Sequence, residues 1–144
     1  MTAAELLCRE EVAVLHGRRI PGCPAPLDHL AVGPGGITVI GAEPLRRRDP
    51  MGLRDLVTGV ERHVDLLRAC LVQWGAGDVD VRGCLCPVDL QGIPHRFTGM
   101  RLRAVPVLDA AGASRLAARP GGLSPSRVAR ITGLLIAALP AARR

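Results

Sequence analysis

Two short β-prone segments, residues 27–33 and 37–40, are joined by a turn rich in glycine and proline at 33–36. Glycine supplies positive φ angles and proline fixes a turn corner, so the chain has to reverse direction there. Because side chains alternate along a strand, Leu30 falls on one face and His29 on the other. The sequence therefore predicts an antiparallel hairpin at the centre of the fold.

An amphipathic pattern follows in residues 49–74. Asp49-Pro50 is typical of a helix start, with Asp as the N-cap and Pro at the first helical position. Apolar side chains then recur every three or four residues and form one stripe: Leu53, Val57, Val60, Val64, Leu67, Leu71 and Trp74. This pattern predicts one long helix whose other face is a solvated surface of mixed charge.

The remaining segments complete an α/β fold. The patterns predict a short helix at 3–11, strands at 12–16, 79–88 and 100–108, and helices at 110–119 and from Ser124-Pro125 onwards. Pro106 indicates that the strand at 100–108 ends early or lies at an edge. After the short first helix the order is β-β-β-α-β-β-α-α. We expect one domain, residues 1–144, with a mixed sheet covered by helices.

The net charge of +6 favours a polyanionic partner. Every basic residue apart from histidine is arginine, and lysine, asparagine and tyrosine are all absent. This composition is typical of a high-GC bacterial genome. One Trp and one Phe leave little to stack on bases, which argues against a single-strand binding platform.

Hydropathy predicts a cytoplasmic protein without a membrane partner. No apolar run approaches the roughly 20 residues needed to span a bilayer. The N-terminal residues lack the basic and apolar regions of a signal peptide.

The five cysteines have no CxxC spacing and are expected to be reduced and mostly buried. The four histidines have no zinc-site spacing, and His29 is expected to be a packed or surface residue rather than a ligand.

The run VLHGRRIPGCPAPLDHLAVGPGGITVI, residues 14–40, resembles the start of a nuclease-related (NERD) domain. In that family a Pro/Gly loop leads to an Ile/Leu-Asp-His strand, a Gly-Pro-Gly-Gly turn and an apolar strand. The later segments match in order and spacing, so the resemblance covers roughly residues 12–140. It implies a restriction-endonuclease-like core of the PD-(D/E)XK superfamily.

The resemblance also implies a chemistry, which is metal-dependent phosphodiester hydrolysis. An Asp on the second strand and an acid on the third hold Mg²⁺, and a Lys two residues later assists the attacking water. Asp28 matches the first acid and is the candidate metal ligand. The second acid falls on Gly41 and the lysine falls on Glu43. The acid of the family's first helix has only stand-ins in the shortened N-terminal segment: Glu5, Glu10 and Glu11.

We therefore expect a domain that is not an enzyme and needs no cofactor. It would bind DNA through non-specific phosphate contacts, or bind a protein partner or a second copy of itself. The candidate phosphate-binding residues flank the hairpin: Arg18, Arg19, Arg46, Arg47 and Arg48.

Two alternatives stay open. In the first, Asp28 and Glu43 together hold Mg²⁺ or Mn²⁺, and one of the arginines at 46–48 supplies positive charge to a rearranged active site. In that case the two carboxylates should converge to roughly 4–5 Å. In the second, the chain is a purely structural or oligomerising module with an exposed apolar patch.

Overall fold

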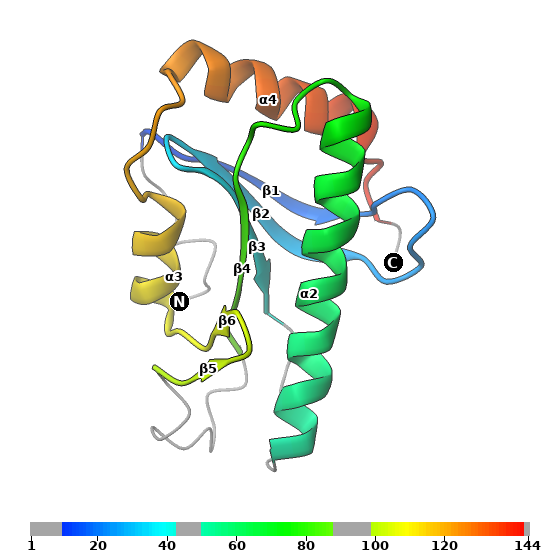
Figure 1. Cartoon of the computed structure of the whole chain (residues 1–144), viewed down its shortest axis with the longest axis vertical. Coiled ribbons are helices and arrows are strands. Elements are labelled where there is room, and N and C mark those ends of the chain that lie inside the picture. Colours follow the sequence, from blue (N-terminus) through cyan, green and yellow to red (C-terminus); the bar gives the residue numbers. More distant parts are fainter. Residues whose placement is uncertain (1–9, 43–49, 88–98, 143–144) are drawn as a thin grey trace.

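The computed structural model describes residues 10–42, 50–87 and 99–142. In these residues four strands form a mixed sheet (Figure 1): β1 (Ala13–Arg18), β2 (Leu27–Gly33), β3 (Gly36–Gly41) and β4 (Val81–Leu85). They lie in the order β1-β2-β3-β4. The first three form an antiparallel meander, and β4 runs parallel to β3. The predicted mixed α/β class is confirmed.

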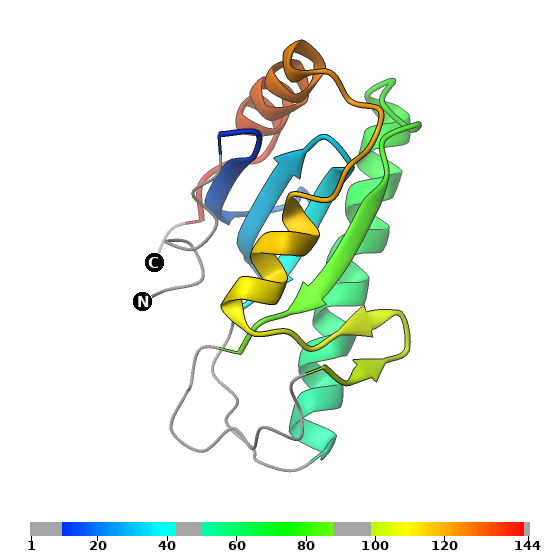
Figure 2. The ribbon, with the colours of Figure 1, turned by 90° about the vertical axis from the view of Figure 1, so that its left-hand side faces the viewer.

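Three helices cover the two faces of this sheet. The 24-residue α2 (Pro50–Gln73) makes the crossover that a parallel β3–β4 pair requires. It shares one face with α4 (Pro125–Ala138), while α3 (Ala110–Ala117) covers the other (Figures 1 and 2). The long helix and the start of α4 are as predicted. None of the helices in the described ranges combines the length and the apolar character needed to cross a membrane.

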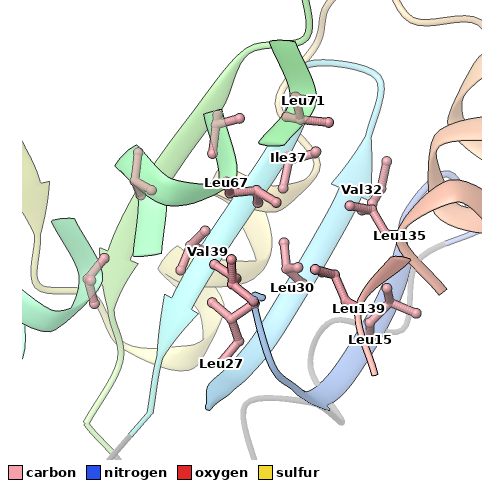
Figure 3. Packing of buried hydrophobic residues seen from close by; sticks show 14 of the residues in the cluster. Leu15, Leu27, Leu30, Val32, Ile37, Val39, Leu67, Leu71, Leu135 and Leu139 are labelled. Carbon is pink, nitrogen blue, oxygen red and sulfur yellow. The ribbon is translucent and has the colours of Figure 1, made fainter. Parts of the chain in front are cut away.

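The larger core lies between the sheet, α2 and α4. Leu30 on β2 and Val39 on β3 are fully buried there, against Leu67 of α2 and Leu135 of α4 (Figure 3). Each such side chain contributes about 1.5–3 kcal/mol relative to an exposed one. A smaller apolar cluster under α3 includes Ala31, Ile40, Cys84, Cys86, Ala113 and Ala117.

The predicted central hairpin is present. Gly33 pairs with Gly36 across the two-residue turn Pro34-Gly35. Gly36 has a φ of 117°, a region that favours glycine, and a Cβ on this residue would collide with the carbonyl oxygen of Asp80. The same glycine therefore permits both the turn and the approach of the chain that leads into β4.

The prediction of one continuous strand at 100–108 is wrong. The chain instead forms two short antiparallel strands, β5 (Arg101–Leu102) and β6 (Val105–Pro106), in a separate two-stranded sheet. Arg103 adopts a positive φ of 55°, which reverses the chain between them. The order in the described residues is therefore β-β-β-α-β-β-β-α-α.

Smaller differences occur at the element ends. β4 is shorter than the predicted segment 79–88. The predicted helix at 3–11 lies outside the described residues except for Glu10 and Glu11, which form a turn. The cysteine prediction is confirmed where the chain is described: Cys23, Cys84 and Cys86 are buried, Cys70 is partly exposed, and all four are free thiols.

Candidate functional site between the β2–β3 hairpin and helix α2

Asp28 lines a small cavity between the hairpin and α2. It is half-buried on β2, and its Oδ2 accepts a hydrogen bond of 2.8 Å from the backbone N–H of Ala42. This bond ties the end of β3 to the start of β2. The cavity has a volume of about 210 Å³, and its lining includes Gly41 of β3 and residues of α2. Asp28 and position 41 therefore border the same space.

The α2 side of the cavity carries Asp55, Gly59 and His63, which are spaced four residues apart along one helix face. His63 Nε2 lies 3.0 Å from the carbonyl oxygen of Ala25. Because a carbonyl only accepts, Nε2 carries the proton and donates it, which leaves Nδ1 as an acceptor in neutral imidazole. This bond holds the loop before β2 against α2.

Several polar side chains line the cavity. Two carboxylates and one imidazole line it, from Asp28, Asp55 and His63. Nevertheless, the described ranges contain no group of three or more His, Cys, Asp or Glu side chains that could hold a metal ion.

Gly41 stands where the resemblance puts the second acid, and it is packed directly under α2. A Cβ on Gly41 would lie 2.6 Å from Val60 Cγ2 and 3.1 Å from Leu85 Cδ1. Val60 is itself buried, and its β-branched side chain has little rotational freedom on a helix. Gly83 on β4 approaches the same valine, because a Cβ there would lie 2.6 Å from Val60 Cγ1. A side chain at position 41 therefore requires Val60, or the helix that carries it, to shift.

Several predicted site residues lie outside the described ranges. These are Glu43 and the three arginines at 46–48. Of the stand-ins for the family's helix acid, Glu10 and Glu11 are exposed just before β1, and Glu5 is not described. The structure thus places Asp28, whereas the predicted approach of the Asp28 and Glu43 carboxylates stays a prediction.

Arg18 and Arg19 lie at the end of β1, beside the C-terminal residues 139–142. The guanidinium of Arg18 donates to the carbonyl oxygen of Leu139 at 3.2 Å, and its Nε is buried. Arg19 is exposed, and its backbone N–H donates to Pro140. Arg18 therefore helps to hold the C-terminal segment against the sheet edge, whereas the side chain of Arg19 projects into solvent.

The structure also gathers arginines that the sequence analysis did not single out. They lie on α2, β4 and the β5–β6 hairpin, which sits beside α2 (Figure 2). Two cavities of about 300 and 330 Å³ share Arg101 in their lining. We call the residues around them the arginine cluster: Arg54, Arg68, Arg82, Arg101 and Arg103.

Two of the five arginines in the arginine cluster are ion-paired, and Glu61 and Asp65 line one of its two cavities. Arg103 pairs with Glu61 at 2.7 Å, and Arg82 pairs with Asp80 at 2.9 Å. Among the described residues, the other three make no ion pair: Arg54, Arg68 and Arg101. In the sequence the only signal was the Arg101-x-Arg103 spacing, because the helix arginines join them only through the tertiary fold.

Comparison with protein-family models, with curated proteins and with solved structures yields no match to this chain.

Proposed function

We propose that this protein is a nuclease-related domain that has lost phosphodiester hydrolysis and binds duplex DNA through its phosphates. One observation carries the proposal, namely the packing of Val60 against Gly41. At the position where an active member would carry its second metal-binding acid, this chain has a glycine. The space that a carboxylate would need is occupied by a stiff apolar side chain.

The arrangement around the hairpin supports the family assignment. Asp28 on β2 and Gly41 on β3 border one cavity beneath α2, so the two motif positions are neighbours in space. The meander β1–β3 followed by a helical crossover to a parallel strand is compatible with a restriction-endonuclease-like core. We include that core in the proposal.

The chemistry of the remaining residues argues against hydrolysis. In active members of that family an acid on the third strand joins the acid on the second strand to hold Mg²⁺, and this chain has Gly41 there; the other carboxylate of the cavity, Asp55, comes from α2. The chain contains no lysine to assist the attacking water. Arginine neutralises a phosphate, but its pKa above about 12 makes it a poor proton carrier. Loss of the second acid and of the lysine therefore removes both metal binding and water activation.

The charge distribution supports DNA as the partner. The chain has a net charge of +6, and three arginines of the arginine cluster have no ion pair within the described ranges. Arginine side chains contact phosphates without reading the base sequence, so binding should be non-specific and sensitive to salt. The two cavities between α2 and the β5–β6 hairpin give the phosphates a hollowed surface to approach.

The test is fluorescence anisotropy with a labelled duplex of about 30 base pairs, titrated at several salt concentrations between about 50 and 200 mM. The log–log slope of affinity against salt should be about −0.9 for each phosphate contacted. Arg101→Ser and Arg54→Ser should each weaken binding. Each should also make the slope shallower by about 0.9, the value for one phosphate contact. Arg130→Ser makes the same charge change at an exposed position on α4, and it should leave the slope unchanged.

Two results would contradict this proposal. If Arg130→Ser reduces the slope as much as Arg101→Ser does, the binding follows net charge rather than the arginine cluster. If no duplex binding is measurable at about 50 mM salt, DNA is not the partner, and a role in protein interaction takes its place.

A further inference from the structure

His16 and His29 form a close pair on the sheet face opposite Asp28. They are register partners on the antiparallel strands β1 and β2. Their Nδ1 atoms lie 2.9 Å apart, and the ring centroids are 5.0 Å apart with the rings nearly perpendicular. His16 is exposed and His29 is half-buried, so the pair opens to solvent on the side of His16.

The separation of the two nitrogens matches that of two adjacent ligands on one metal ion. Imidazole nitrogens bind first-row metals at about 2.0 Å. Two nitrogens at that distance from an ion and 2.9 Å from each other subtend an angle of roughly 90°. A tetrahedral ion needs a separation of about 3.3 Å, so the pair suits a square-planar or octahedral ion better than Zn²⁺.

We propose that His16 and His29 form a two-histidine chelate for a divalent transition metal of tetragonal geometry, of the Ni²⁺ or Cu²⁺ class. Without metal, one Nδ1–H donates to the other Nδ1. With metal, both rings take the tautomer protonated at Nε2, and both Nδ1 lone pairs bind the ion. The remaining coordination positions face solvent and are open to water or to another ligand.

The sheet holds the two ligands in place. Antiparallel partners directly opposite one another keep their Cβ atoms about 4.5–5.5 Å apart, so both imidazoles are already on one face at one level. Little side-chain ordering is needed on binding, which favours a chelate over two independent surface histidines. The site also lies apart from the cavity of Asp28, because successive residues of β2 point to opposite faces. It is therefore independent of the proposed loss of hydrolysis.

The test uses Ni²⁺ as the probe, because thiols of the five cysteines would reduce Cu²⁺. Isothermal titration of the full-length protein at neutral pH should show one saturable site. His16→Gln and His29→Gln should each weaken Ni²⁺ binding at least tenfold, because a single imidazole loses the chelate. Zn²⁺ should bind the wild-type protein more weakly than Ni²⁺ does. His63→Gln, which removes a histidine outside the pair, should leave Ni²⁺ affinity within about twofold of wild type.

His16 is exposed, so His16→Gln tests the chelate with little effect on the core, and a thermal melt of each variant confirms that it folds. Three results would overturn the proposal. The first is no saturable Ni²⁺ binding by the wild-type protein. The second is unchanged affinity in the folded His16→Gln variant. The third is an equal loss of affinity in His63→Gln.

Discussion

Gly41 of β3 and Val60 of α2 are in direct contact, and no side chain fits between them. A Cβ on Gly41 would stand 2.6 Å from Val60 Cγ2, well inside van der Waals distance. The strand residue and the helix residue therefore constrain each other. Glycine at 41 lets α2 lie close to the sheet, and valine at 60 then excludes an acid from position 41.

The first prediction concerns this contact. Gly41→Ala should lower the free energy of unfolding by about 1–3 kcal/mol, because the added methyl overpacks the interface. In a Val60→Ala background the same change should cost less, since the colliding atoms are gone. Urea denaturation of the two single variants and the double variant measures the coupling.

Gly59→Ala is the matched control for this cycle. A Cβ on Gly59 would meet no atom within 4 Å, although it precedes Val60 in the same helix. That substitution should stabilise the protein by roughly 0.5–1 kcal/mol through helix propensity alone. Strict additivity of Gly41→Ala and Val60→Ala would contradict the account of the contact.

We predict that Asp28 contributes to the stability of the fold through its hydrogen bond to Ala42. Asp28→Ala leaves the N–H of Ala42 without its acceptor at a residue that is only 7% exposed. An unsatisfied buried donor costs about 1–3 kcal/mol. Asp28→Asn retains a side-chain oxygen and should cost clearly less. Equal stability of the two variants in urea denaturation would show that the bond to Ala42 contributes nothing.

The pH dependence of stability should include a contribution from His29. Burial lowers its pKa from the usual 6.5, the nearby His16 lowers it further, and Asp28 opposes the shift. The folded protein therefore binds fewer protons here than the unfolded chain. The stabilising contribution is fully present above pH 6.5 and is lost as the pH falls through the lowered pKa. In thermal melts in metal-free buffer, the decrease in Tm between about pH 7.5 and 5 should be smaller for His29→Gln than for wild type. An identical decrease would contradict this prediction.

Thiol reactivity should follow burial. Burial raises the pKa of Cys84 to about 12, with the neighbouring Cys86 as a further cause, so almost no thiolate forms at pH 8. The pKa of Cys86 is also raised, by burial and then by Asp109. Iodoacetamide at pH 8 followed by peptide mass spectrometry should modify the partly exposed Cys70 well before these two. Rapid labelling of Cys84 in the folded protein would contradict the burial of the α3 face.

The hairpin, α2 and α4 could be predicted because their signals are local. A Gly-Pro turn, a stripe with helical spacing and a Ser-Pro start each act over a few residues. The β5–β6 reversal carries no such signal, because Arg103 holds a positive φ that usually favours glycine. A run of alternating residues therefore looked like one continuous strand.

The candidate site was predictable only in part. Asp28 and the glycine at 41 are visible in the motif itself. The filling of that space by Val60, which lies in a different element, depends on how α2 packs against the sheet. The arginine cluster and the His16–His29 pair likewise join residues from different elements, and the sequence shows only the Arg101-x-Arg103 spacing within them.

The most direct test of the central claim is a plasmid-nicking assay of the wild-type protein with Mg²⁺ and with Mn²⁺, beside Asp28→Ala and Glu43→Ala. A glycine at 41 closed off by Val60 predicts that supercoiled plasmid stays intact with all three proteins and both metals. Metal-dependent nicking by the wild-type protein that both substitutions abolish would contradict it and would establish a rearranged nuclease site.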